Sequence, residues 1–417
     1  MRLRDITHIV LLSGSMTVLS CRSSDDTPPL CSELPAIPAD AKSTESMLAM
    51  ALVDRGYTIS KMHAVDPRSG SSRCIAGSES GDPRLVPLGS GALALFNRKA
   101  TQLNMRFGAR TADGGVEFGS QLATPQAAGG DPHDALSVDQ DRVLLAMNTS
   151  GKLIVASRTS GALLQDVRAD WDFSPAPADA PLRPISLWRT QLPENLTSVG
   201  TGTLVDSIIV VHQGLDANYQ PNGSQRIFVL SVSADGIAPR DLDPSAPGVQ
   251  GIALNFSNPG QLVNVWTGKP LLVSLCYGNP ECRSGVEQFD PATLSVASRI
   301  SLDSAGMIGN GSLADGNEPL LFHAAMAAGF EPEAAKWIVR IDASKESIAE
   351  QITKVHTFPA GSSGSWFLQF DRSSGRLWVG DAAPDATGIL SLHDPGEAQV
   401  RTTNLPMIPA SGAFVAP

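Results

Sequence analysis

Charged and aromatic side chains are both scarce in this chain. Only 18% of its 417 residues are Asp, Glu, Lys or Arg, and only 5% are Phe, Trp or Tyr. The 31 basic residues stand against 42 acidic ones, so the formal net charge is -11. No basic stretch with interleaved aromatic residues occurs. Because nucleic-acid grooves need concentrated positive charge, we expect no nucleic acid among the partners.

Several motifs that carry chemistry are also missing. The chain has no Gly-x-Ser-x-Gly elbow, no Walker loop, no Gly-x-Gly-x-x-Gly and no His-Glu-x-x-His. Its single histidines lack metal-ligand spacing, and we expect them at the surface or in hairpins: His63, His212, His323, His356 and His393. We therefore predict no catalytic residues, no metal and no cofactor, and a binding role in preference to an enzymatic one.

Glycine and proline, in contrast, are abundant. The 38 Gly and 30 Pro favour many turns over long helices. The alanine-rich stretch 323–336 has helical propensity, but it contains Gly329 and Pro332, so we predict a loop or a single turn there. Four tryptophans in strand-like contexts are predicted to pack between strands: Trp266, Trp337, Trp366 and Trp378.

The N-terminus has the layout of an export signal. Two arginines precede an apolar run, residues 9–19, that is too short to span a bilayer. The end of this run resembles the lipobox of bacterial lipoproteins, in which a small residue precedes a lipidated cysteine: Val18, Leu19, Ser20 and Cys21.

The lipobox resemblance implies a signal peptide at 1–20, lipid attachment at Cys21 and a flexible tether at 21–42. In that family an aspartate after the cysteine marks inner-membrane retention, and here that position is Arg22. The resemblance therefore implies a cell-envelope protein, lipid-anchored in the outer membrane. The alternative is an ordinary signal peptide that happens to contain a cysteine.

Four cysteines follow Cys21, an even number that suits disulfides in an exported chain. Three pairings are possible. Cys276 and Cys282 are close in sequence and favour a local bridge, which leaves Cys31 with Cys74. A zinc site is the rival interpretation, but no Cys-x-x-Cys occurs.

One strand-turn-strand pattern recurs along the chain, often with Asp-Pro-x-Ser/Thr-Gly in the turn. The spacing is 45 to 57 residues, apart from one interval of 75, and such periods are typical of four-stranded propeller blades. Each turn should join the third and fourth strands of its blade. The seven turns lie at Asp66, Thr111, Arg158, Ser233, Asp290, Asp342 and His393.

The predicted fold class is all-β: a seven-bladed β-propeller of four-stranded antiparallel blades, with six or eight blades as alternatives. It occupies 43–417 as one domain, and the long interval holds a Pro-rich insert near 171–187. The segment 405–415 is predicted to add a closing strand to the first blade, which would remove a free edge.

The stretch 130–161 resembles a YVTN-type β-propeller repeat of surface-layer-like proteins, in which Asn/Asp-Pro opens the inner strand. Asp131 and Pro132 supply that opening, and residues 81–83 repeat it one blade earlier. The match departs from the family pattern at 145–147, where Leu, Ala and Met replace the namesake residues.

The opening of this repeat holds the most attractive polar cluster: Asp131, His133 and Asp134. Two carboxylates beside an imidazole can tune its pKa toward about 7 or hold a metal at the mouth of an axial channel. Neighbouring strand residues point to opposite faces, however, so these groups are expected mainly to cap a turn.

Three functions remain open. The first is a lipid-anchored binding or scaffold module for a protein, glycan or envelope partner, by analogy with other propellers. The second is a channel-centred enzyme, quinoprotein-dehydrogenase-like or lyase-like. The third is structural packing within a surface layer.

Overall fold

The computed structural model consists almost entirely of short β-strands. The described residues are 47–54, 60–65, 72–79, 83–89, 91–97, 103–111, 116–124, 131–167, 173–174, 183–194, 203–216, 218–276, 282–329, 331, 333–362, 364–365, 367–381, 389–393, 400–404 and 408–415. Within them the α-helical residues are those of α1 (Ile348–Gln351). No helix in this part of the chain has the length and apolar character needed to cross a membrane.

Six of the described sheets are built from strands that follow one another along the chain. From the innermost strand outward they are β4 (Pro83–Gly89), β5 (Ala92–Asn97), β6 (Leu103–Arg110) and β7 (Val116–Phe118); β9 (Pro132–Ser137), β10 (Arg142–Met147), β11 (Lys152–Ser157) and β12 (Leu163–Asp166); β14 (Pro184–Pro193), β15 (Leu204–His212), β16 (Arg226–Ser233) and β17 (Gly236–Arg240); β20 (Pro259–Val263), β21 (Leu271–Ser274), β22 (Gly285–Asp290) and β23 (Ser295–Ser301); β24 (Ile308–Asp315), β25 (Leu321–Ala327), β26 (Lys336–Asp342) and β27 (Ile352–Thr357); β28 (Phe367–Asp371), β29 (Arg376–Asp381), β30 (Ile389–His393) and β31 (Val400–Asn404).

A further sheet joins the two ends of the described chain. Its order is β32 (Ile408–Val415), β1 (Met47–Val53), β2 (Ser60–Val65) and β3 (Ser72–Glu79), and Leu48 pairs with Phe414 across the β1–β32 boundary. The predicted closing strand is thereby confirmed. We call each of these four-strand sheets a blade and name it after its innermost strand.

Four short strands complete the list. β8 (Leu122–Thr124) pairs with β6, β19 (Ile252–Ala253) pairs with β16, and β13 (Phe173–Ser174) pairs in parallel with β18 (Val249–Gln250).

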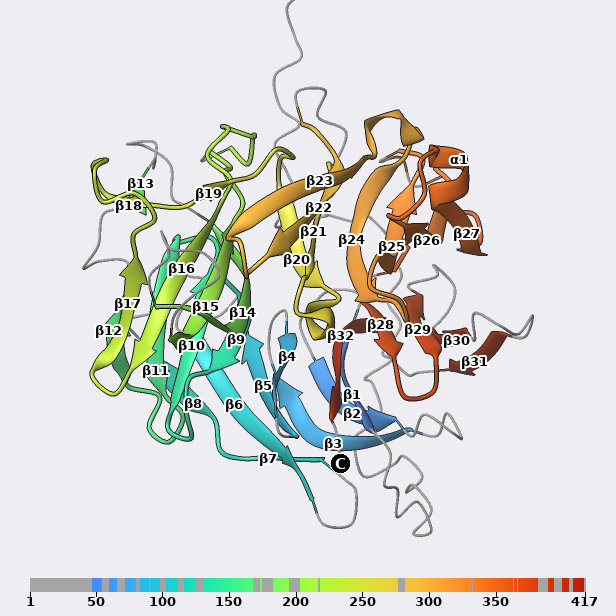
Figure 1. Ribbon diagram of the computed structural model, residues 1–417. Helices are drawn as coiled ribbons and strands as arrows, with labels where there is room; N and C mark the ends of the chain where they lie inside the picture. The colour runs from blue at the N-terminus through green and yellow to red at the C-terminus, as the bar shows by residue number, and fades with distance from the viewer. Residues whose placement is uncertain are drawn as a thin grey trace, which may run out of the picture.

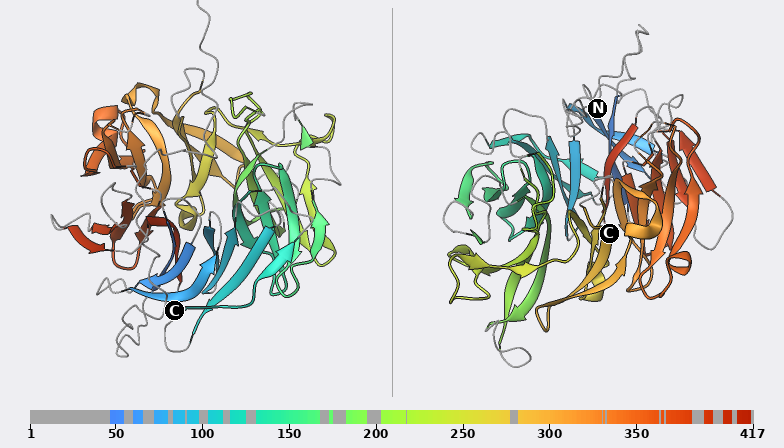
Figure 2. Two further views of the ribbon diagram at one scale, coloured as in Figure 1. Left: turned by 180° about the vertical axis from the view of Figure 1, so that it is seen from behind. Right: turned by 90° about the horizontal axis from the view of Figure 1, so that it is seen from above.

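The blades surround a common axis (Figures 1 and 2). The inner strands contact one another in a closed circuit that runs β32, β4, β9, β14, β20, β24, β28 and back to β32. Each neighbouring pair of blades encloses its own cluster of buried apolar side chains. The prediction of an all-β propeller with four-stranded antiparallel blades is confirmed.

The recurring turns fall where the repeat predicts them. Thr111 follows β6 and Arg158 follows β11, and the turns at Ser233, Asp290, Asp342 and His393 likewise separate the third strand of a blade from the fourth. The predicted turn at Asp66 lies outside the described residues. The turn at Asp342 shows why these residues suit it, because its Oδ1 accepts hydrogen bonds from the Ser344 amide and hydroxyl.

The second strand of each blade is packed on both faces by neighbouring blades. In β15 the four residues from Ile208 to Val211 are fully buried, and β25 is buried along its whole length. Such strands read as continuous apolar runs because they have no solvent face. The predicted loop at 323–336 is therefore wrong: its first part is β25, where packing between blades overrides the helical propensity of alanine.

The boundary of the Pro-rich insert also needs correction. Its predicted end at 187 lies inside β14, which begins at Pro184. Proline suits the first residue of a strand, because its missing amide hydrogen breaks no ladder bond there. The inner strands β4, β9 and β20 begin with proline as well: Pro83, Pro132 and Pro259.

Several single residues differ from their predicted surroundings. His63, His212 and His323 are buried in strands, not placed at the surface, and burial lowers the pKa of His63 and of His323 to about 4. Trp378 is buried as predicted, but Trp266 is 37% exposed and lies in the 3-10 turn Val265–Thr267.

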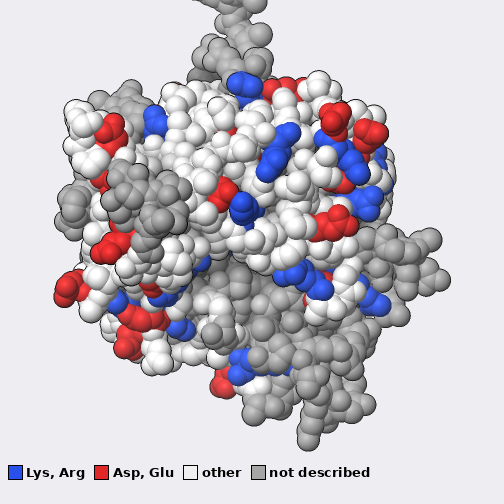
Figure 3. Space-filling model, viewed as in Figure 1, with Lys and Arg blue, Asp and Glu red and all other residues white. Residues whose placement is uncertain are grey.

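Charge is mixed over the described part of the face in Figure 3, where Lys and Arg alternate with Asp and Glu and neither sign forms a continuous field. This arrangement favours local pairing over long-range attraction of a highly charged polymer.

Candidate functional site

The polar cluster singled out in the sequence divides into two parts. His133 Nε2 lies 3.1 Å from Asp131 Oδ2, and Thr149 Oγ1 donates to the same carboxylate oxygen at 3.5 Å. Asp131 has a φ of 45°, a left-handed conformation that Asp and Asn tolerate better than most residues. It therefore places its side chain beside His133 at the start of β9, with the two side chains 25% and 21% exposed.

Asp134 points the other way, toward the next blade. Its Oδ2 accepts hydrogen bonds from the Leu187 amide at 2.7 Å and from the Ser186 hydroxyl at 3.3 Å, while Oδ1 accepts from the Ala135 amide. Burial raises the pKa of Asp134 to about 6, against the hydrogen bond from Leu187 and the positive charge of Arg84. The carboxyl group thus joins β9 to β14, and the three predicted residues do not converge on one ligand.

The same joint recurs between other inner strands. Ser186 Oγ accepts a hydrogen bond from the Leu262 amide at 3.2 Å, which joins β14 to β20. Ser411 Oγ accepts one from the Leu85 amide at 3.0 Å, which joins β32 to β4. A short polar side chain on one inner strand thus binds the backbone of the next, and Asp134 is the ionisable member of this series.

A chain of side-chain amides also links blades where the inner strands begin. Asn148 Nδ2 donates to Gln213 Oε1 at 2.9 Å, and Gln213 Nε2 donates to Asn258 Oδ1 at 2.8 Å. Asn258 Nδ2 then donates to the Leu275 carbonyl at 3.2 Å. These residues were not among the candidates predicted from the sequence. The signals were Asn148 at the end of the YVTN-like strand and an Asx-Pro pair at Asn258, whose φ of 52° matches the conformation of Asp131.

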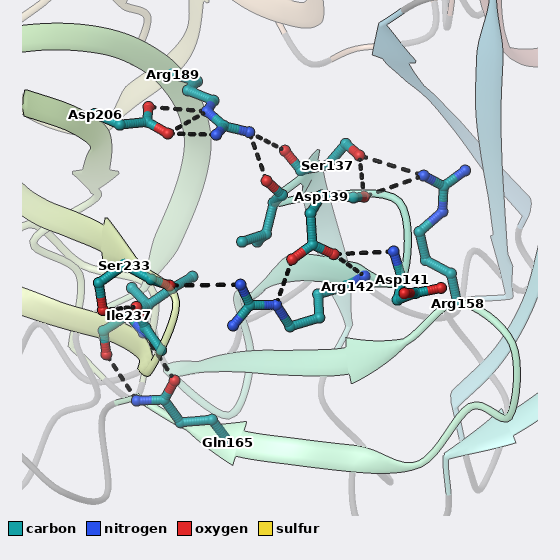
Figure 4. Close-up of polar contacts among 12 residues, drawn as sticks. Ser137, Asp139, Asp141, Arg142, Arg158, Gln165, Arg189, Asp206, Ser233 and Ile237 are labelled. Atoms are coloured by element: carbon teal, nitrogen blue, oxygen red, sulfur yellow. Dashed lines mark hydrogen bonds and ion pairs between the residues drawn. The ribbon is translucent and has the colours of Figure 1, made fainter.

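An ion-pair network crosses from the β9 blade to the β14 blade (Figure 4). The Arg189 guanidinium binds Asp206 and also donates to the carbonyls of Ser137 and Val138, at 3.0 and 2.7 Å. Arg142 Nε donates to Asp139 at 2.6 Å. These charged groups bind backbone carbonyls and one another. The network therefore has a structural role: it joins the β9 blade to the β14 blade.

The cysteines partly fulfil the predicted pairing. Cys276 and Cys282 form a disulfide, and Cys74 is also disulfide-bonded. Cys31 and the predicted lipid site Cys21 lie outside the described residues. Within the described part of the chain, no group of three or more His, Cys, Asp and Glu side chains is placed to hold a metal ion.

A concave surface lies between the β20 and β24 blades. It is a groove of about 580 Å³ between the outermost strand β23 and the segment that contains α1. Polar side chains dominate its lining: Ser298, Arg299, Ser301, Ser304, Ser344, Lys345, Glu346 and Gln351. Its apolar floor continues the core that these two blades share: Ile300, Leu320 and Ala343.

One acceptor in this groove has no hydrogen-bond partner. Gln351 is 96% buried, since its exposure is 4%, and its Nε2 donates to the carbonyls of Lys345 and Glu346. That orientation fixes the amide and leaves Oε1 as a buried acceptor without a donor. Such an atom carries a desolvation cost, and it is enclosed beneath the surface of the groove.

No protein-family model and no curated protein matches this chain. Solved structures do match. The periplasmic gluconolactonase PpgL of Pseudomonas aeruginosa is 14% identical, with a TM-score of 0.57 over 89% of this chain and 99% of that one. A putative 6-phosphogluconolactonase from Bacteroides fragilis is 13% identical, with a TM-score of 0.54 over 91% and 99% of the two chains.

A protein from Lactobacillus plantarum is similar to the same degree, at 11% identity and a TM-score of 0.54 over 89% and 99%. Identities this low establish a shared propeller fold and nothing about chemistry, because one fold hosts many functions.

Proposed function

We propose that this protein is a binding module of the cell envelope that holds an extended segment of a partner protein in the groove between the β20 and β24 blades. The observation that carries the proposal is the groove itself. Its volume of about 580 Å³ falls in the range of ligand sites.

The strand beside the groove favours a main-chain ligand. β23 is the outermost strand of its blade and has seven residues, of which Arg299 is the charged one. Outer strands usually carry charges or proline, which prevent another chain from pairing with them. An extended peptide adds to such an edge through backbone hydrogen bonds, while pockets beside it select side chains.

The lining of the groove agrees with this ligand. It contains no aromatic residue to stack on a sugar ring, but it offers four serine hydroxyls: Ser298, Ser301, Ser304 and Ser344.

The proposal also includes a lipid anchor at the N-terminus and a closed propeller of seven blades. The lipobox resemblance supports attachment through Cys21 to the outer membrane, with 21–42 as a tether. The closed circuit of inner strands supports seven blades, one for each four-strand path, and the Asp-Pro opening at Asp131 supports the YVTN type. The ring would then act as a rigid support for the groove.

A peptide library displayed on phage tests the groove with the protein lacking Cys21. Ser298→Trp fills the groove, whereas Ser295→Trp adds the same side chain to the same strand outside it. We expect enriched peptides to lose binding at least tenfold to the first variant and to keep it with the second. Peptides that bind both variants equally, or no enrichment over an empty support, would refute the proposal.

The second candidate function is that of an enzyme with its active site in the central channel. It needs His133 and Asp134 to face one substrate, but Asp134 is turned toward β14 and is occupied by backbone bonds. The ionisable character of Asp134 and the nearby charge of Arg84 are what favour this alternative. A cofactor absorbance or a metal that copurifies with the protein, and is lost in His133→Ala, would reverse the order.

A further inference from the structure

Three inner strands end close together on the ring, and the loops that follow them meet. The turn after β20 is held by Asn264, which is fully buried and has a φ of 55°. The backbone N–H of Asn264 donates to Asp315 Oδ1 at 2.7 Å, and the side-chain Nδ2 of Asn264 donates to the Leu321 carbonyl at 2.7 Å. Asn264 Oδ1 in turn accepts a hydrogen bond from the Gly316 amide. The β20 loop is thereby fixed to the β24 loop.

Asn264 fixes the position of an exposed tryptophan. Trp266 lies in the 3-10 turn that starts directly after Asn264, and 37% of its surface remains exposed. The guanidinium carbon of Arg372, from the loop after β28, lies 3.7 Å from the centre of the Trp266 ring. Arginine on one ring face restrains the indole, so its orientation is set before any ligand arrives.

A carboxyl group completes this cluster. Asp315 ends β24, between the blades that supply Trp266 and Arg372, and it keeps a half-buried position. Its burial raises the pKa, while the nearby positive charge of Arg372 lowers it. An exposed aromatic ring, a guanidinium and a carboxyl group from three consecutive blades therefore gather at the ends of the inner strands.

We propose that Trp266, Asp315 and Arg372 form a binding site for a neutral hexose unit of a glycan. A pyranose presents a C–H face and a rim of hydroxyl groups. The C–H face packs on an indole, because both surfaces are apolar and flat. The carboxylate accepts hydrogen bonds from hydroxyl groups and the guanidinium donates to them. A neutral sugar fits best, because the charges of Asp315 and Arg372 cancel.

This site goes beyond the peptide groove in both place and ligand. The groove lining contains none of the three residues. A protein with both sites would hold a partner chain and an envelope glycan at once, and each site can fail alone.

An array of immobilised neutral oligosaccharides, ending in glucose, galactose, mannose or N-acetylglucosamine, tests the sugar site with the protein lacking Cys21. We expect at least one of these to be retained, and Trp266→Ala to weaken its retention at least tenfold. The matched control is Trp337→Ala, because Trp337 has a comparable cation contact, with Lys354 Nζ at 3.7 Å from its ring centre.

A second variant separates binding from folding. Arg372→Gln keeps a side chain over the indole but removes the charge, and we expect it to weaken retention several-fold while the thermal midpoint stays within a few degrees of the wild type. Retention that is equal in wild type, Trp266→Ala and Arg372→Gln would overturn the proposal. Absence of all retention would also overturn it, and peptide binding in the groove would be unaffected by either result.

Discussion

The buried carboxyl group of Asp134 makes a measurable prediction about stability and pH. Burial raises its pKa from the ordinary value of 3.8 to about 6, despite the hydrogen bond from the Leu187 amide. The folded protein therefore binds this proton more tightly than the unfolded chain does. The resulting stabilisation is complete below pH 3.8 and is lost as the pH rises through about 6.

The magnitude follows from the shift. A difference of about two pKa units corresponds to about 3 kcal/mol in the free energy of unfolding. Replacement of Asp134 by Asn removes the ionisable group and keeps an acceptor for the Leu187 amide. We expect the free energy of unfolding of Asp134→Asn to change less with pH than that of the wild type. The difference between the two should shift by about 2 kcal/mol between pH 4 and pH 7.

Urea unfolding at several pH values, followed by circular dichroism, measures this difference. Asp290→Asn is the control of opposite sign, because the hydrogen bond from Lys269 lowers the pKa of Asp290. Its contribution is present at neutral pH and is lost as the pH falls below the ordinary range of aspartate. If the wild type and Asp134→Asn have parallel pH profiles, the reasoning about burial is refuted.

Three further perturbations test the ring. Removal of 408–415 leaves β1 with an unpaired edge, and we expect a loss of more than about 4 kcal/mol together with aggregates in gel filtration. Asn148→Ala breaks the bond to Gln213, and urea unfolding should show a loss of about 1 to 2 kcal/mol. Replacement of Cys276 and Cys282 by serine should lower the free energy of unfolding by about 2 kcal/mol in urea unfolding, because the loop they close is short. A wild-type protein treated with reductant should lose more than that, because the disulfide of Cys74 is reduced as well.

The fold could be predicted because turn chemistry repeats visibly while strand sequences vary. Asp and Gly at the turns are required by local backbone geometry, so they persist between the third and fourth strands of the blades. The closing strand was also readable, because residues 408–415 are β-prone and β1 would otherwise keep a free edge.

The errors arose where packing between blades overrides local preference. The alanines of β25 favour a helix in isolation, yet the blades on both sides bury them. His63 and His323 lie in strands whose neighbours exclude water, and a single histidine in a sequence gives no sign of that. The Pro-rich insert was predicted to end at 187, beyond its true end, because Pro184 begins a strand.

The candidate sites depended on contacts between blades, which sequence spacing does not describe. Asp131 and His133 were found because they are two residues apart on one strand. Trp266 and Arg372 are distant in sequence and meet only because the ring brings their loops together. Their roles become visible once the order of the blades is known.

Ring closure has a consequence for how this protein must be made. The hydrogen bond between Leu85 and Ser411 spans 326 positions, and bringing such distant segments together costs about 5 kcal/mol in chain entropy. A ribosome delivers β1 long before β32, so the first sheet waits for its innermost member throughout synthesis. During that interval β1 is an open template for other nascent chains, and a chaperone that covers it would protect the yield without ever touching the finished protein.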